Sequence, residues 1–329
     1  MSPIVYAVPY VPPQPPLDPW RGPSQRWESP DGSVWSISGP GAGGVRLMPG
    51  VRGLTWPKRE AFIEESAGVH GGRWRGYRDG VREVFWPLSV YRDTDSAGWL
   101  DYDAAFWRSL GSDVPGRWVV THPSGAERYL LVRWLEDGDP PWDFSPGLVA
   151  WAAYGARGVA VDPYWRGPAI TPAAWSGEPT PGESFFGAGG PPFTISEGST
   201  LASATITNPG DQPAYPVWWV RDVTSVDLTV AGATVEVPAV ADDRLLVVDT
   251  DPTALSALEV VAPPDGATPQ EQEAWVAARL PTALDRTVQL GAGTAWGVIP
   301  PEATSPVGID MVGTGWVRVQ IVPRWRRAW

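Results

Sequence analysis

Glycine and proline make up nearly a quarter of this chain, with 37 Gly and 38 Pro among 329 residues. Gly loses much conformational entropy in a regular element, and Pro removes a backbone donor and clashes with the preceding helical turn. Such a chain favours short strands joined by turns over long helices. Hydrophobic residues are 43% and charged residues 19% of the chain, as in globular proteins. The length suffices for two domains, so we expect a mainly β protein in two domains.

The charge and the residue usage exclude several classes of protein. The net charge is −12, and −10 of it falls in residues 176–329, so the clustered positive field of a nucleic-acid binder is missing. Without cysteine the chain can form neither disulfides nor thiolate metal sites, which indicates assembly in a reducing cytoplasm or a protein stabilised by its size and oligomerisation. No apolar run reaches the roughly 20 residues of a membrane span, and the N-terminus lacks the pattern of a signal peptide. We expect a soluble protein with no cofactor.

The first domain is expected over residues 21–176, after an extended Pro-rich arm over residues 1–20. The prolines of this arm exclude a helix or a central strand, and they include Pro9, Pro12, Pro13, Pro15, Pro16 and Pro19. We predict strands over 33–38 and 148–161, strands around a turn at Asp79-Gly80 within 71–90, and a hairpin of 117–121 with 127–135. The glycine loop 39–44 lacks the residues of a phosphate cradle.

The clearest helix of this domain is predicted over residues 98–110. Ser96 is the expected N-cap and Gly111 the expected C-terminal cap. The face that we expect to pack on a sheet consists of Leu100, Asp103, Trp107 and Leu110.

The second domain is expected over residues 177–329, after a linker composition that runs from 168 to about 192. We predict strands over 201–207, 217–220, 225–230, 234–237, 244–249, 286–290 and 315–322. In the last strand Val317, Val319 and Ile321 point one way, and Arg318 and Gln320 the other. A capping box at 268–271 starts a helix that ends near Arg279. This pattern predicts a β-sandwich.

Tryptophan occurs 21 times, and each side chain has on the order of 200 Å² to bury. Core and subunit-interface packing explains most of these residues. Platforms for stacking on sugars are the alternative for a minority, and the candidate sugar or partner contacts are Trp218, Trp219 and Trp296.

The residues of hydrolytic or metal chemistry are sparse. Only His70 and His122 could act as a base, both stand in turn-like settings, and no Gly-x-Ser-x-Gly elbow is present. The acidic groups at 136–139 and 242–243 lack the ligand series of a calcium loop and are interpreted as solvated turns. A glycosidase needs two carboxylates about 5–9.5 Å apart in a groove, which remains a weak alternative. We expect no catalytic or metal-binding residues.

Several segments, in order, resemble the distal tail proteins of long-tailed phages (siphophages), which are often called minor tail proteins in phages of GC-rich, actinobacterial hosts. In the first domain they are DGSVW (31–35), GVRGL (50–54), the hairpin at 117–135 and DPYW (162–165). In the second they are TITNPGD (205–211), YP (215–216), LVVDT (246–250) and WVRVQIVPRW (316–325). Their order carries the resemblance more than any one segment. The Pro-rich stretch and helix at about 262–281 and the N-terminal arm depart from the pattern.

This resemblance implies a homohexameric ring made by the first domain, which continues the tail tube, and a galectin-like β-sandwich projecting outward. The protein would sit at the distal end of the virion tail after assembly in the host cytoplasm. Its partners would be itself, the major tail tube protein and the hub, baseplate and receptor-binding proteins of the tail tip. DNA would only pass through the lumen, and no membrane insertion is implied. A carbohydrate-binding host-recognition module is the alternative, followed by a tail-associated glycosidase.

One concentration of basic residues needs an interpretation within such a ring. Its candidate inter-subunit or lumen residues are Arg46, Arg52, Arg59, Arg73, Arg75, Arg78 and Arg82, with Lys58 and Arg92 nearby. They could contact DNA in the lumen, or pair across subunits with the interleaved Glu60, Glu64, Glu65, Asp79 and Glu83. We favour the ion pairs, because a channel that releases DNA quickly gains nothing from binding it.

Overall fold

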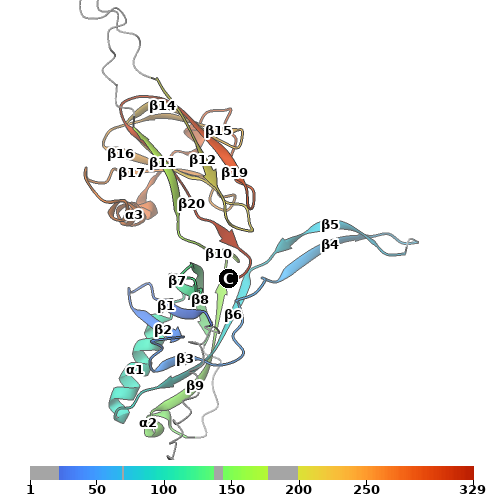
Figure 1. Ribbon diagram of the computed structural model, residues 1–329, viewed down its shortest axis with the longest axis vertical. Helices are drawn as coiled ribbons and strands as arrows, with labels where there is room; N and C mark the ends of the chain where they lie inside the picture. The colour runs from blue at the N-terminus through green and yellow to red at the C-terminus, as the bar shows by residue number, and fades with distance from the viewer. Residues whose placement is uncertain (1–21, 69, 137–143, 177–198) are drawn as a thin grey trace, which may run out of the picture. The chain divides into compact units, whose positions relative to one another are not determined.

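A computed structural model describes residues 22–68, 70–136, 144–176 and 199–329 (Figure 1). The chain is mainly β, as the sequence predicts. It forms two compact units: the first contains the chain up to Gly53, Arg82–Val161 and Trp329, and the second contains Leu54–Val81 and Asp162–Ala328. The second unit thus starts before the expected boundary at 176 and includes a segment from the middle of the expected first domain. No helix among the described residues is long and apolar enough to span a membrane.

The first unit is built on one antiparallel sheet with the strand order β2-β1-β7-β8-β9-β6-β3. Its strands are β1 (Ser24–Glu28), β2 (Val34–Ser38), β3 (Val45–Leu47), β6 (Arg82–Tyr91), β7 (Gly116–Thr121), β8 (Glu127–Glu136) and β9 (Trp151–Ala160). Alternate residues of β6 are buried, which is the period of a strand with one face on a core. The end strands β2 and β3 contact each other, so the sheet curves into a near-barrel. The predicted hairpin of β7 and β8 is confirmed.

Tryptophans fill the interior of this near-barrel. Trp27, Trp86 and Trp118 are fully buried, and the Trp86 ring centroid lies 5.7 Å from that of Trp27 and 5.2 Å from that of Trp118. Trp134 completes the group at 4.3 Å from Trp86. Gly116 is required beside them, because a Cβ there would collide with the Trp27 ring. Core packing therefore accounts for these rings, as we expected for most of the tryptophans.

Helix α1 (Ser96–Ser109) differs in detail from the prediction. Its N-cap is Asp95, whose carboxylate accepts a hydrogen bond from the Gly98 amide at 2.8 Å, and not Ser96. It ends on Leu110 without the expected glycine cap at Gly111. Its buried residues are Trp99, Phe106 and Ser109, whereas Leu100 of the expected face is 54% exposed. The larger rings take the core position and rotate the buried face by one residue. A short helix α2 (Pro146–Val149) occupies the start of the strand predicted at 148–161.

The second unit contains a β-sandwich, as predicted. One sheet has the order β11-β20-β13-β16-β17-β18 and the other β12-β19-β14-β15. The strands of the first sheet are β11 (Ile170–Ser176), β13 (Val217–Arg221), β16 (Arg244–Asp249), β17 (Ser256–Val261), β18 (Leu284–Asp285) and β20 (Trp316–Ile321). Those of the second are β12 (Ser199–Thr207), β14 (Val223–Val230), β15 (Ala233–Val240) and β19 (Thr304–Val312). Two strand pairs stand outside the sandwich: β4 (Arg59–Glu65) with β5 (Gly72–Asp79), and β10 (Trp165–Arg166) with β21 (Arg324–Trp325).

Hydrophobic residues from both sheets form the core between them. Trp218, Leu228 and Val319 are each at most 1% exposed in this cluster. A second cluster lies on the other face of the larger sheet, where Val276 of helix α3 (Pro269–Ala277) packs with Trp219. The capping box predicted for α3 is present.

Some expectations for this unit were wrong. Residues 286–290 are not a strand but contain the 3-10 turn η2 (Thr287–Gln289), which follows another, η1 (Leu280–Thr282). Strand β11 lies in the stretch expected to be a linker, and β4, β17 and β19 were not predicted. The N-terminal arm, residues 137–139 and residues 177–192 lie outside the described residues.

Candidate functional site

The hairpin of β4 and β5 is exposed along nearly its whole length. Its two strands pair with each other and, among the described strands, with no other (Figure 1). Nearly every residue of both strands is exposed. The sequence predicted β5 with a partner after the turn at Asp79-Gly80, but its partner is the preceding strand β4. Since an isolated two-stranded hairpin is marginally stable in water, other contacts must hold it.

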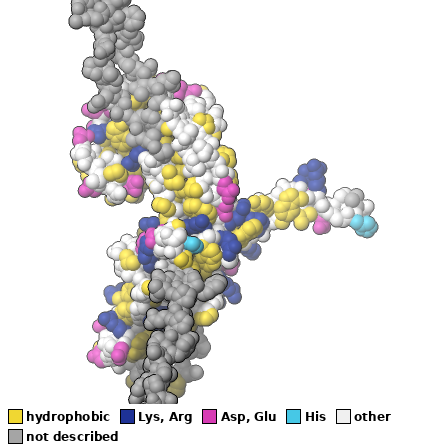
Figure 2. All heavy atoms as spheres, in the orientation of Figure 1, with side chains coloured by type: hydrophobic (Ala, Val, Ile, Leu, Met, Phe, Trp, Pro, Cys, Tyr) yellow, Lys and Arg dark blue, Asp and Glu magenta, His cyan; other side chains and the backbone are white. Residues whose placement is uncertain are grey.

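Large apolar side chains are exposed along this hairpin. Ile63 lies opposite Trp74 and Ala61 opposite Tyr77 in the strand register. Trp74 is 58% exposed, Ile63 56% and Tyr77 42%. The two rings lie 6.4 Å apart, so they share one side of the hairpin. Figure 2 shows hydrophobic and basic side chains side by side along it. We call Ile63, Trp74 and Tyr77 the apolar strip.

The charged residues of the hairpin pair within the chain. Arg75 donates to Glu64 at 2.6 Å and Arg78 to Glu60 at 2.7 Å. Both pairs join the two strands of the hairpin within one chain, and their glutamates are among those interleaved with the arginines in the sequence. Exposed pairs of this kind contribute about 0–1 kcal/mol each. Among the described residues Arg73 forms no ion pair.

A buried carboxylate fixes the base of the hairpin. The Asp79 side chain is fully buried and accepts hydrogen bonds from Arg59 Nε at 2.9 Å, Tyr164 Oη at 3.1 Å and Arg326 Nε at 3.2 Å. Burial raises the pKa of Asp79, but the three hydrogen bonds outweigh it and hold that pKa below its ordinary value. Burial, followed by the Asp79 charge, raises the pKa of Tyr164, which keeps its hydroxyl a donor. We call Arg59, Asp79, Tyr164 and Arg326 the Asp79 cluster.

Aromatic rings extend the Asp79 cluster into the hairpin. The Arg59 guanidinium lies 3.9 Å from the Tyr77 ring centroid and 4.7 Å from that of Trp56. Arg326 also donates to the Tyr77 hydroxyl at 2.8 Å. Cation–π contacts of this kind add roughly 0.5–2 kcal/mol each. The hairpin is thereby joined to two other segments of its unit, around Tyr164 and around Arg326. Sequence reasoning named Arg59 and Asp79 but missed Tyr164 and Arg326, which lie far away in the chain.

The remaining candidate arginines belong to the first unit, whereas those of the hairpin belong to the second. Arg82 is 1% exposed and donates to the Gly53 carbonyl at 2.7 Å, so it is an interior residue and lines no lumen. Arg52 lies 5.8 Å from the Phe85 ring centroid. Arg46 lines the pocket described below.

The three candidate tryptophans are placed in or against the sandwich core. Trp218 is 1% and Trp219 5% exposed, so neither offers a ring face to a sugar. The Arg318 guanidinium covers the Trp219 ring at 4.0 Å. Trp296 is partly buried and packs against the same core as Trp218. The stacking role proposed for Trp218 and Trp219 is therefore wrong, because both rings are used for packing.

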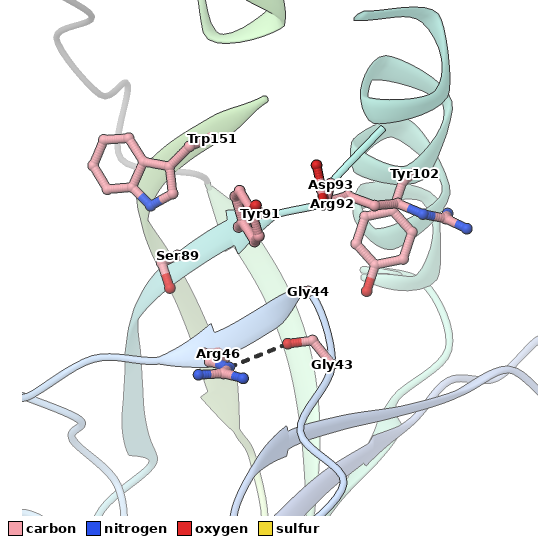
Figure 3. A pocket seen from close by; sticks show the side chains of 9 residues that line it. All are labelled: Gly43, Gly44, Arg46, Ser89, Tyr91, Arg92, Asp93, Tyr102 and Trp151. Atoms are coloured by element: carbon pink, nitrogen blue, oxygen red, sulfur yellow. Dashed lines mark hydrogen bonds between the residues drawn. The ribbon is translucent and has the colours of Figure 1, made fainter. Parts of the chain in front are cut away.

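The first unit holds an open pocket of about 710 Å³ that the sequence did not indicate (Figure 3). Tyr91 of β6 and Trp151 of β9 lie opposite each other in the register, and each is about half exposed. The Arg92 guanidinium lies 4.7 Å from the Tyr102 ring centroid. The residues that line the pocket are Gly43, Gly44, Arg46, Ser89, Tyr91, Arg92, Asp93, Tyr102 and Trp151.

The two histidines belong to different units. His122 is in the exposed turn between β7 and β8, where its Nδ1 lies 2.8 Å from Ser124 Oγ. His70 is in the loop between β4 and β5. Among the described residues, no three or more His, Asp or Glu side chains are grouped so as to hold a metal ion.

The sequence itself matches no family model and no curated protein. Among solved structures it is similar to the Dit (gp 19.1) protein of phage SPP1, with a TM-score of 0.51, 12% identity, and 92% of this chain and 99% of that chain covered. The chain has the fold of a phage Dit protein. The Dit-like fold also occurs in the phage P2 baseplate in its activated conformation. The TM-scores are 0.51 with Ca and 0.52 with Sr, at 10% identity, with 92% of this chain and 97% and 98% of those chains covered. The structure of SPP1 Dit is described as a paradigm of the hub adsorption apparatus in phages that infect Gram-positive bacteria.

Proposed function

We propose that this protein is a structural hub of a phage tail tip, whose copies close into a ring through the β4–β5 hairpin. The observation that carries the proposal is an exposed hairpin with an apolar strip and a buried ionic anchor, in a chain with a Dit-like fold. In an isolated chain this hairpin is unfavourable, because exposing Ile63, Trp74 and Tyr77 to water costs free energy. A second copy of the chain is the occupant that we assign to the strip.

The ring is a homohexamer of a siphophage with an actinobacterial host, and it joins the tail tube to the baseplate and the receptor-binding proteins. A head-to-tail contact that closes on itself gives such a ring. The sandwich of the second unit is galectin-like and serves as the docking domain for those partners. The protein works at the distal end of the virion tail, it assembles in the host cytoplasm, and DNA only passes through the lumen. This role needs no catalysis, so we propose that the protein is not an enzyme.

Native mass spectrometry of the full chain tests the ring. We expect a closed oligomer of six copies for the natural sequence, and its loss in the double variant Ile63→Ser, Trp74→Ser. Val288→Ser is the matched control, because Val288 is 94% exposed in the same unit and outside the hairpin. A monomer at every concentration, or a ring that the double variant leaves intact, would refute the proposal.

Trp218 and Trp219 are buried, so only Trp296 of the three candidate tryptophans stays partly accessible, and little supports a carbohydrate-binding module. A glycosidase needs two carboxylates in a groove, and the lining of the pocket in the first unit includes a single one, Asp93. We therefore propose neither of these alternatives.

A further inference from the structure

The pocket of the first unit presents aromatic rings that the fold itself does not need. Tyr91 is 50% and Trp151 47% exposed, at the ends of two adjacent strands. Figure 3 shows both rings beside Ser89, with Tyr102 of α1 on the other side of the pocket. Rings that belonged to the hydrophobic core would be buried, so these two rings are not core residues. Grooves lined by exposed aromatic rings are the usual binding sites of Pro-rich segments in the polyproline II conformation.

Basic groups accompany the rings. Arg46 donates to the Gly43 carbonyl at 3.3 Å, and Arg92 lies over the Tyr102 ring. Among the described residues neither guanidinium forms an ion pair, although Asp93 also lines the pocket. Each guanidinium has five N–H donors, so both keep donors for a carboxylate. A ligand with apolar rings and one acidic group suits this pocket.

The N-terminal arm of the chain has that chemistry. It carries Pro-x-x-Pro spacings at residues 9 and 12, 12 and 15, 13 and 16, and 16 and 19. Its single acidic residue is Asp18. Proline fixes φ near the polyproline II value, so such a segment loses little entropy on binding.

The place where the arm enters the fold favours the pocket of the same chain. Gly39 packs against Ser24 at the start of β1, since a Cβ on Gly39 would lie 2.6 Å from the Ser24 Cβ. Gly43 of the pocket follows four residues later, which is at most about 14 Å of chain. The six residue steps from Asp18 to Ser24 span up to about 20 Å. This length of chain is sufficient for Asp18 to meet the arginines of its own pocket, and a short tether gives the arm a high effective concentration there.

We propose that the pocket of Arg46, Tyr91, Arg92, Tyr102 and Trp151 binds the Pro-rich arm of its own chain, residues 9–19. The prolines stack on the rings of Tyr91 and Trp151, and the Asp18 carboxylate faces Arg46 and Arg92. This inference does not depend on ring formation.

The absence of cysteine makes a distance measurement direct. In the full chain, Gln14→Cys on the arm and Ser124→Cys in the turn between β7 and β8 each carry a nitroxide label. Double electron–electron resonance is expected to give one narrow distance distribution. Tyr91→Ala with Trp151→Ala broadens it, and Trp151→Phe alone retains it because a ring remains. Trp74→Ala, a similarly exposed tryptophan outside the pocket, leaves it narrow.

A second measurement does not depend on the labels. A synthetic peptide of residues 7–20 is titrated into the chain that lacks residues 2–21, and we expect saturable binding that the Asp18→Asn peptide weakens at least several-fold. Circular dichroism of each variant establishes that the pocket variants fold.

Several results would overturn the proposal. A distance distribution that is equally broad in the natural chain and in the variant that lacks Tyr91 and Trp151 would contradict it. A narrow distribution that disappears on dilution with excess unlabelled protein would assign the pocket to the arm of a second copy and contradict the same-chain assignment. A pocket that binds N-acetylglucosamine but not the peptide would identify a sugar site instead.

Discussion

Replacing Asp79 by asparagine removes the carboxylate at the centre of the Asp79 cluster and keeps the size of the side chain. Removing one partner of a buried ion pair costs about 3–5 kcal/mol. Arg59 and Arg326 retain side-chain exposures of 28% and 20%, so water can hydrate part of each guanidinium. The remaining amide oxygen also accepts one of the three hydrogen bonds. We therefore expect the free energy of unfolding of the second unit to fall by about 2–3 kcal/mol, below the range for a fully buried pair.

Hydrogen exchange locates this loss. Since Asp79 ties the base of the hairpin to the segments around Tyr164 and Arg326, the amides of β4 and β5 should exchange faster in Asp79→Asn. Urea unfolding gives the total change. Asp265→Asn is the control, because Asp265 is 87% exposed and pairs with Arg221 at the surface, where the loss should stay below about 1 kcal/mol.

A double-mutant cycle separates the cluster from a general effect of the substitution. Arg326→Met in the Asp79→Asn background should cost less than in the natural chain, since its partner is already absent. Two results would refute the assignment of Asp79 as the anchor. One is an equal loss in the free energy of unfolding for Asp79→Asn and Asp265→Asn, and the other is unchanged amide hydrogen exchange in the hairpin of Asp79→Asn.

Three further predictions concern pH and packing. The pKa of Asp79 is lowered in the folded state, so its contribution to the free energy of unfolding is complete above the unfolded pKa of about 3.9 and is lost as the pH falls through the lower folded value. Below pH 4, the urea midpoint of Asp79→Asn should therefore depend less on pH than that of the natural chain. The same dependence on pH in both proteins would contradict this. Arg318→Met should raise the free energy of unfolding by about 1–3 kcal/mol. Burial lowers the pKa of Arg318, and two of its nitrogens have no hydrogen-bond partner among the described residues. A lower Tm in this variant would contradict the prediction. Trp86→Ala should cost about 3–5 kcal/mol in urea unfolding, since the ring contacts three other buried tryptophans, and a loss below 1 kcal/mol would show that the near-barrel core repacks.

Local signals were sufficient for the elements that the sequence predicted well. The turn of the β14–β15 hairpin is Ala231-Gly232, with φ of 50° and 84°, the left-handed backbone that a two-residue hairpin turn requires. The capping box of α3 likewise depends on Thr268 and Glu271, three residues apart. In both cases residues within three positions of each other make the interaction, so the local sequence contains the whole signal.

The hairpin and its anchor could not be predicted in this way. Strand β4 has no buried face, so it lacks the alternation that identifies a half-buried strand. The Asp79 cluster joins residues separated by 85 and 247 positions, and no local pattern connects them. Arg318 shows a related limit: alternation correctly placed it opposite Val317 and Val319, but that face is covered by the second core cluster and is not exposed.

The apolar strip sets a bound on how the proposed ring is held together. Ile63, Trp74 and Tyr77 are about half exposed, and burying the rest of each side chain contributes roughly 1 kcal/mol, or about 3 kcal/mol for the strip. Bringing two free chains together costs about 4–15 kcal/mol, so the strip alone does not hold a dimer. Further surface must be buried with it, and closure helps, since each copy in a ring makes two contacts. About 3 kcal/mol is still a factor of roughly one hundred in affinity, which makes the hairpin a decisive contact but not a sufficient one.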